Sequence, residues 1–230
     1  MNLAVMQPYI FPYLGYFQMI AAADVFVSYD TVDYMQRGWV NRNRILMHGS
    51  AKYFTVSVQK SALGTPIHQV LIKDYDSWSD SFLNSIRNAY LKAPHFKALY
   101  ELLTEFVLSK KHTHIGALAQ ESLKIICNHL GIATTIVSAQ ELSIPQALNR
   151  QERLEFLITS YKAQRMVLPP GSKELYQDWN PDCEKAILAM PEFTYTQHVS
   201  EFVPFLSILD TMAYVDLETI KHQIHSPKWQ

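Results

Sequence analysis

The chain has 230 residues and a formal net charge of -1 at pH 7, and 48% of its residues are apolar against 18% charged. This composition excludes a disordered chain, and the near-zero charge excludes a global field that would attract nucleic acid or a membrane surface. The length suits a single α/β domain over residues 1–230. Any anion-binding site must therefore be local.

The cysteines and the N-terminus point to a cytoplasmic setting. Only Cys127 and Cys183 occur, without CxxC spacing, and Cys127 lies in an apolar helical pattern typical of a core residue. A reducing compartment fits this usage. The first residues lack a basic flank before an apolar run, which Pro8 and Pro12 interrupt. We therefore expect no signal peptide and no membrane span.

Residues 1–44 carry the clearest pattern. Residues 3–6 and 25–27 are apolar runs that indicate buried strands, and helical spacing over 14–21 lies between them. This strand–turn–helix–strand order predicts a βαβ unit, the basis of a Rossmann-like parallel sheet. Open parallel sheets bind ligands beyond the carboxyl ends of their strands. The turn at 7–16 should therefore cover a ligand site.

Several side chains of this turn are candidates for substrate binding. They are Gln7, Tyr9, Tyr13, Gly15 and Tyr16. The glycine lets backbone approach a ligand, and the helix that follows offers free N–H groups to an anion. Asp30, at the end of the second strand, is a candidate catalytic group. The alternative is that prolines and tyrosines only pack a tight turn.

Residues 39–45 and 52–58 alternate around His48-Gly49, which predicts an inserted β-hairpin. Alternation places Arg42 and Arg44 on one face, and two arginines form a fork for phosphate or carboxylate. We assign them as candidate catalytic groups; a solvated strand face is the alternative. Trp39, Asn41 and Asn43, from the same segment, are candidates for substrate binding.

The rest of the chain predicts further helices and strands. Helices are expected over 78–90, 96–107, 115–130 and 152–161, and strands over 67–72, 133–138, 166–168 and 193–198. Ser77 should cap the first of these helices and Gly131 should end the third. Residues 78–131 form a mainly helical layer or subdomain. The last ordered segment is expected at 203–214, with a frayed tail from residue 222.

The turn and a later loop resemble two sequence motifs of nucleotidyltransferases of the HxGH type. Residues 12–16 keep the central glycine of that motif, with tyrosines in place of histidines, and Gly171, Ser172 and Lys173 resemble the late lysine loop. A phenol stays neutral near pH 7, so the arginines or Lys173 would supply positive charge. Gln7, Tyr9 and Asn41 would then orient the substrate.

The runs Q-P-Y-I-F-P-Y-L-G-Y-F, A-D-V-F-V-S-Y-D and W-V-N-R-N-R-I resemble the opening of the WbqC-like proteins, with further echoes at 168–176 and 205–210. Those bacterial proteins are linked to gene clusters for O-antigen and other surface polysaccharides. The resemblance implies a role in that pathway, and transferases that decorate sugars have been suggested in the family. Thr31 and Asp33 depart from the family pattern, which has an acidic residue and a glutamine there.

Asp210 is an acid within an apolar run. Burial would force it to find partners, so it is either a structural cap or ion pair, or a catalytic base. No histidine has zinc spacing with a cysteine or carboxylate, so no metal site is expected.

The favoured hypothesis is a cytoplasmic transferase of surface-polysaccharide biosynthesis. It would move an amino-acyl or similar small group onto an activated sugar, so its substrate is a small molecule, nucleotide-linked or acyl-activated. One alternative is a nucleotidyltransferase or ATP-dependent ligase, and another is a non-catalytic protein that binds a partner of the same pathway. No cofactor is specified beyond a nucleotide or nucleotide-sugar ligand, and the oligomeric state stays open.

Overall fold

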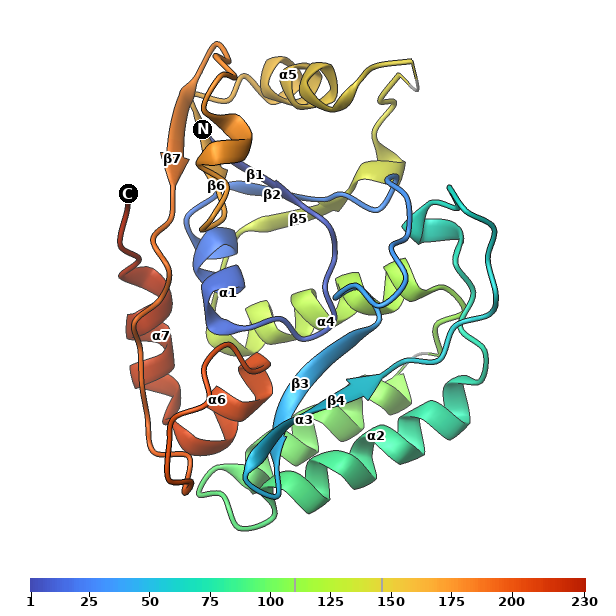
Figure 1. The fold of residues 1–230 in the computed structure, drawn as a ribbon, viewed down its shortest axis with the longest axis vertical. Coiled ribbons are helices and arrows are strands. Elements are labelled where there is room, and N and C mark those ends of the chain that lie inside the picture. The colour runs from blue at the N-terminus through green and yellow to red at the C-terminus, as the bar shows by residue number, and fades with distance from the viewer. Residues whose placement is uncertain (110, 146) are drawn as a thin grey trace.

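A computed structural model describes residues 1–109, 111–145 and 147–230. Its centre is a five-stranded parallel sheet in the order β5-β2-β1-β6-β7, with a separate two-stranded antiparallel hairpin, β3-β4 (Figure 1). The strands are β1 (Asn2–Met6), β2 (Val25–Ser28), β3 (Arg42–Met47), β4 (Ser50–Thr55), β5 (Thr135–Ser138), β6 (Arg165–Leu168) and β7 (Glu184–Ile187). The predicted mixed α/β fold with a parallel sheet and an inserted hairpin is confirmed.

Seven α-helices and three short 3₁₀ helices are described. The α-helices are α1 (Leu14–Ala21), α2 (Tyr75–Tyr90), α3 (Phe96–Ser109), α4 (Ile115–Leu130), α5 (Arg150–Tyr161), α6 (Ile208–Tyr214) and α7 (Leu217–His225). The 3₁₀ helices are η1 (Ile67–Gln69), η2 (Ala139–Glu141) and η3 (Glu174–Tyr176).

Helices cover both faces of the sheet. Ala4 of β1 belongs to the larger core on the α1 and α4 side, whereas Leu3 belongs to a second core that includes Leu154 and Leu157 of α5. Figure 1 shows α5 on one side of the sheet and α1 and α4 on the other. The first crossover runs from β1 to β2 and the later one returns to β6 on the other side of β1. Such a change of direction marks the usual ligand crevice of a doubly wound sheet.

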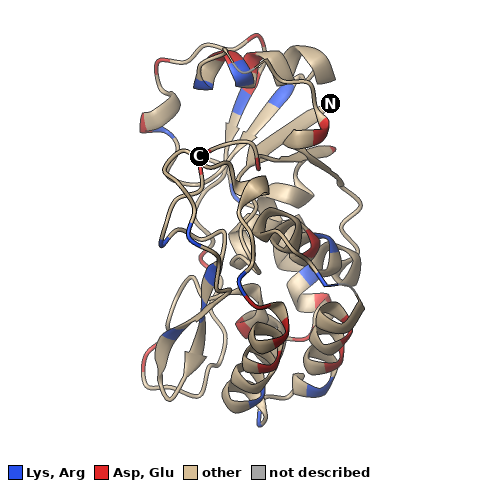
Figure 2. Ribbon diagram, turned by 90° about the vertical axis from the view of Figure 1, so that its right-hand side faces the viewer, with Lys and Arg blue, Asp and Glu red and all other residues tan. Residues whose placement is uncertain are grey.

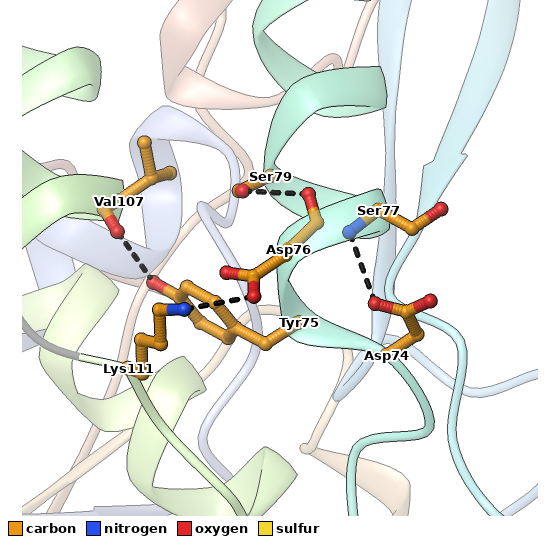
Figure 3. A network of polar contacts seen from close by, with 7 residues as sticks. All are labelled: Asp74, Tyr75, Asp76, Ser77, Ser79, Val107 and Lys111. Carbon is orange, nitrogen blue, oxygen red and sulfur yellow. Dashed lines mark hydrogen bonds and ion pairs between the residues drawn. The ribbon is translucent and has the colours of Figure 1, made fainter.

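The hairpin and the helices α2 and α3 lie at the end of the molecule opposite α5 (Figure 1). At the start of α2, the Asp74 carboxylate accepts a hydrogen bond from the backbone N–H of Ser77 at 3.0 Å, so Asp74 is the cap and the predicted Ser77 cap is wrong. Figure 3 shows two links from this turn to the end of α3 and the residues after it. The Tyr75 hydroxyl donates to the carbonyl of Val107, and Lys111 forms an ion pair with Asp76.

Two predicted strands are absent from the structure. Residues 67–72 begin with η1, because the backbone N–H of Ile67 bonds to the Val32 carbonyl and the chain turns there to bury Ile67. Residues 193–198 alternate in burial as a strand would, but Tyr195 and Gln197 point their polar atoms at α6 rather than pairing with another strand. The alternation of apolar and polar residues in the sequence does not distinguish these two segments from true strands.

The C-terminal region is more ordered than expected. The strand β7 was missed because its sequence, Glu-Lys-Ala-Ile, lacks an apolar run at the sheet edge. The helix α7 was also missed, and the predicted frayed tail is wrong, because Ile220 and Ile224 are buried and Gln230 donates its backbone N–H to the Ile187 carbonyl. The tail thus extends along the edge of the sheet.

Figure 2 shows Lys and Arg residues mixed with Asp and Glu residues over the helices, strands and loops. Within the described residues, no helix has both the length and the apolar character needed to cross a bilayer.

Candidate functional site

The turn that leaves β1 is anchored from three directions. Phe11 has a φ of 42° and is fully buried, and its backbone N–H donates to Ser122 Oγ of α4 at 3.2 Å. Its carbonyl accepts from Ser207 Oγ at 2.6 Å and from Asn43 Nδ2 at 2.9 Å. Asn43, predicted to bind substrate, therefore fixes the turn through its amide, which also bonds to the carbonyl of Ile10.

The first turn of α1 is packed rather than open. A Cβ at Gly15 would lie 2.6 Å from the Tyr13 ring and 3.2 Å from Pro191. The glycine thus makes room for protein side chains, whereas the sequence predicted room for a ligand. Tyr16 is buried and donates its hydroxyl to the Gln7 carbonyl at 2.5 Å, so it supports the turn from below.

Beside this turn lies a cavity of about 220 Å³, here called the aromatic cavity. Its walls include Tyr9, Tyr13, Trp39, Arg44, Pro170 and Phe205. Burial raises the pKa of Tyr9 and Tyr13, so both phenols stay neutral and act as hydrogen-bonding rings. Five predicted site residues thus meet in one place with a proline of the loop that follows β6, namely Tyr9, Tyr13, Trp39, Asn43 and Arg44.

The two arginines have different surroundings. The Arg44 guanidinium lies 5.6 Å from the centre of the Trp39 ring and donates from Nη2 to the Phe205 carbonyl at 3.1 Å. Its Nε is buried and has no hydrogen-bond partner among the described residues. Arg42 instead lies 4.4 Å over the Tyr53 ring and donates to backbone carbonyls of the preceding turn. Arg44 therefore lines the aromatic cavity, whereas Arg42 does not.

A larger cavity of about 840 Å³, here called the polar cavity, lies at the carboxyl ends of β1, β2 and β5. Its polar lining includes Gln7, Thr31, Asp33, His68, Gln140 and Arg153. The aromatic and polar cavities flank the same short segment, because Gln7 lines one and Tyr9 lines the other.

Asp30 is buried and does not line the polar cavity, but it forms hydrogen bonds with Gln140 and His68, which do. Its carboxylate accepts from Ser138 Oγ at 2.5 Å and from the backbone N–H of Gln140 at 3.1 Å. Its carbonyl accepts the backbone N–H of His68 at 3.0 Å, and His68 Nδ1 lies 3.0 Å from the same oxygen. Asp30 thus ties the ends of β2 and β5 to η1.

Asp210 is fully buried in α6 and has three hydrogen-bond donors. Tyr90 and Tyr195 donate their hydroxyls at 2.8 and 2.7 Å, and Gln197 donates its amide at 2.9 Å. Burial raises the pKa of its carboxyl above the ordinary value, despite these bonds. These contacts fit a structural role for Asp210, because they join α6 to α2 and to residues 195–197, which precede α6.

The remaining predicted residues lie near the aromatic cavity without lining it. Asn41 is buried and donates its amide to the Val56 carbonyl at 2.9 Å. In the loop after β6, Gly171 has a φ of 77°, Ser172 donates to the Pro169 carbonyl at 2.7 Å, and Lys173 is exposed.

Sequence reasoning missed His68, Gln140 and Arg153. Gln140 follows the strand at 133–138, so the rule that placed Asp30 at a strand end also applies to it. His68 was hidden by the wrong strand at 67–72. Among residues 1–109, 111–145 and 147–230, no three His, Cys, Asp or Glu side chains are grouped to hold a metal ion.

Comparison with known proteins identifies the family. The sequence profile of the WbqC-like protein family matches residues 7–222. The chain belongs to the WbqC-like protein family. It is 29% identical over 222 residues to a protein of Mycobacterium tuberculosis named "Uncharacterized protein Rv1507c". The aligned region covers 94% of this chain and 95% of that protein. No solved structure matches the chain. Every residue lining the two cavities of this WbqC-like protein falls inside the matched range.

Proposed function

We propose that this WbqC-like protein is a transferase of bacterial surface-polysaccharide biosynthesis that moves an amino-acyl or similar small group onto an activated sugar. The pathway rests on the family. The reaction type rests on one observation: two chemically different cavities flank the Gln7–Tyr9 segment at the carboxyl edge of a doubly wound sheet. A group transfer needs two substrates side by side.

The aromatic cavity suits a ligand with a flat or apolar body and an anionic end. Tyr9, Tyr13 and Trp39 offer ring surfaces, and Arg44 offers a charged donor next to them. Lys173 extends from the neighbouring loop and would add a second positive charge. We assign the activated donor to this cavity.

The polar cavity suits a sugar. Amide, hydroxyl, carboxylate and guanidinium groups line it, and such groups form directional hydrogen bonds with sugar hydroxyls. Arg153 would face the negative charge of a nucleotide-linked acceptor.

A nucleotidyltransferase or ATP-dependent ligase is the second candidate, favoured by the doubly wound sheet alone. In the HxGH type the first helix turn receives the triphosphate, but here the Tyr13 ring and Pro191 fill the space above Gly15. A triphosphate would therefore depend on Arg44 and Lys173.

Calorimetric titration of the wild type with nucleotide-linked amino sugars, aminoacyl thioester analogues, and ATP or CTP with Mg²⁺ tests the proposal. Arg44→Ala should weaken binding of the acyl donor about tenfold, because a charged contact is lost. Gln140→Ala should weaken binding of the sugar by about the same factor, because its amide can make more than one hydrogen bond. Arg42→Ala is the matched control, because that side chain packs on Tyr53. Binding of ATP or CTP alone would favour the second candidate, and no binding of either substrate class at millimolar concentration would contradict the transferase. A non-catalytic partner protein would also bind neither class.

A further inference from the structure

The imidazole of His68 has a fixed orientation at the wall of the polar cavity. His68 Nδ1 lies 3.0 Å from the Asp30 carbonyl oxygen. A carbonyl oxygen only accepts hydrogen bonds, so Nδ1 must carry the proton of the neutral ring. Nε2 is then the unprotonated nitrogen. The side-chain amide nitrogen of Gln69 lies 3.3 Å from Nε2, a contact that fits the same tautomer and that a substrate amine would replace.

The backbone under this ring is held from two sides. The N–H groups of Ile67 and His68 donate to the carbonyls of Val32 and Asp30, each at 3.0 Å. On the other side, α4 approaches so closely at Gly116 that a Cβ there would lie 3.2 Å from the His68 Cα. A ring with a fixed tautomer on a fixed backbone is the arrangement that a positioned general base requires.

An anionic group lies in the same cavity. Asp33 is paired through its backbone with Pro66, just before η1, and its side chain lines the polar cavity together with His68. A carboxylate in this place attracts an amine. The neighbouring amides and Thr31 hydroxyl suit the remaining sugar hydroxyls.

We propose that the polar cavity binds the acceptor as an amino sugar and that His68 Nε2 is the general base for its attacking amino group. This inference rests on the proposed transfer reaction and names the acceptor class and the base. Asp33 is the residue that recognises the amine, and Asp30 is a positioning residue that acts through His68.

The chemical step balances as follows. The amine, neutral after losing one proton to water, forms a bond from nitrogen to the acyl carbon of a thioester or acyl phosphate. The nitrogen passes a proton to His68 Nε2. The bond between the acyl carbon and the sulfur or phosphate oxygen breaks, and the leaving group takes the bonding electrons and then the proton from Nε2. The imidazole ends neutral, and the product is an amide.

The tautomer is testable without any substrate. Nitrogen NMR of histidine-labelled protein above pH 8 should show one ring with its proton on Nδ1 that disappears in His68→Asn. An Nε2-protonated ring at this position would overturn the assignment of the base. His48→Asn, in the exposed β3–β4 turn, is the matched control.

The acceptor site is tested by protection. Diethyl pyrocarbonate acylates an unprotonated imidazole nitrogen, so His68 should react and UDP-glucosamine should slow that reaction at least several-fold, with UDP-glucose protecting less. If UDP-glucosamine binds in calorimetry without protecting His68, the sugar lies elsewhere and the inference fails while the transferase survives. If neither probe binds or protects, the inference fails together with its assigned acceptor.

The catalytic role is separated from a structural one by two substitutions. His68→Asn keeps an N–H group for the Asp30 carbonyl and lacks Nε2, whereas His68→Gln keeps a polar group near Nε2 and lacks the bond to Asp30. For a general base, both variants should bind UDP-glucosamine within about threefold of wild type, and acyl transfer to it should fall about 100-fold or more. Transfer that survives in His68→Asn would overturn the role.

Discussion

The aromatic and polar cavities lie on either side of one segment, yet they are built in different ways. Most walls of the aromatic cavity come from residues close together in sequence, within the first βαβ unit and the strand after it. The polar cavity is assembled from connections that leave β1, β2 and β5, together with η1 and α5. Local sequence therefore defines the first cavity, and the order of strands in the sheet defines the second.

The two cavities are also stabilised differently. The aromatic cavity rests on the buried Phe11 turn, in which the Phe11 ring stacks on Phe82 with 5.6 Å between ring centres and meets Phe106 edge to face at 5.1 Å. The polar cavity rests on hydrogen bonds of Asp30. Burial of a large ring contributes several kcal/mol at one position, whereas a single hydrogen bond contributes about 1 kcal/mol. Substitutions should thus separate the two regions by the size of their effects.

The largest effect is expected from Phe11→Ala. Loss of a fully buried ring should lower the free energy of unfolding by about 3–5 kcal/mol, because the cavity left behind cannot close around the anchored backbone. Urea denaturation measures this change. Phe205→Ala, at a ring that is 43% exposed, is the control and should lose about 1 kcal/mol. Equal losses for both variants would show that the turn does not carry the aromatic cavity.

The next effect concerns Asp210, which holds α6 and thereby the Ser207 anchor of the same turn. Asp210→Asn should lower the free energy of unfolding by about 1–3 kcal/mol at pH 4, because one amide replaces an acceptor of three donors. Asp210→Ala should lose more, since it leaves those donors unpaired.

The pH dependence of this variant follows from the raised pKa of Asp210. The folded state holds the proton more tightly than the unfolded state, so this stabilising contribution is full below the unfolded value of about 3.9 and is lost as pH rises through the folded pKa. The deficit of Asp210→Asn relative to wild type should therefore shrink from pH 4 to pH 7. A deficit that grows over this range would contradict the burial argument.

A pair of glycine substitutions compares the cavities directly. Gly116→Ala should move η1 and lower the free energy of unfolding by up to about 2 kcal/mol, because overpacking against backbone exceeds the gain in helix propensity. The His68 tautomer signal should shift in this variant. Gly15→Ala should instead turn the Tyr13 ring and weaken ligand binding in the aromatic cavity, without shifting the nitrogen signal of His68. If each variant altered both cavities equally, they would be one coupled site.

The sequence identified the elements whose pattern reports burial on one face. The strands β1 and β2, the helices α3, α4 and α5, and the alternation of Arg42 and Arg44 with buried Asn41 and Asn43 were all predicted. Elements whose neighbours decide their structure were not. The polar edge strand β7 and the 3₁₀ turn of η1 depend on distant contacts that no local period records.

The candidate site divides in the same way. Tyr9, Tyr13, Trp39 and Arg44 were found because they lie in one short stretch, and the structure brings them together. The partners of Asp210, namely Tyr90, Tyr195 and Gln197, come from segments far apart in sequence. His68 likewise meets Asp30 only because η1 folds back on the end of β2. Such pairs follow from chain topology, which the residue pattern does not contain.

The smallest effect is expected from two serines that are neighbours across β2 and β5. Ser138 donates to Asp30 at 2.5 Å, whereas the buried Oγ of its register partner Ser28 has no hydrogen-bond partner among the described residues. Ser138→Ala should lower the free energy of unfolding by about 1 kcal/mol and loosen His68, because Asp30 loses one of its donors. Ser28→Ala should be neutral or slightly stabilising, because a buried unpaired hydroxyl is removed. Denaturation curves and the His68 nitrogen signal measure both variants. A larger loss in Ser28→Ala would show that the polar cavity depends on packing of the strand ends rather than on hydrogen bonds to Asp30.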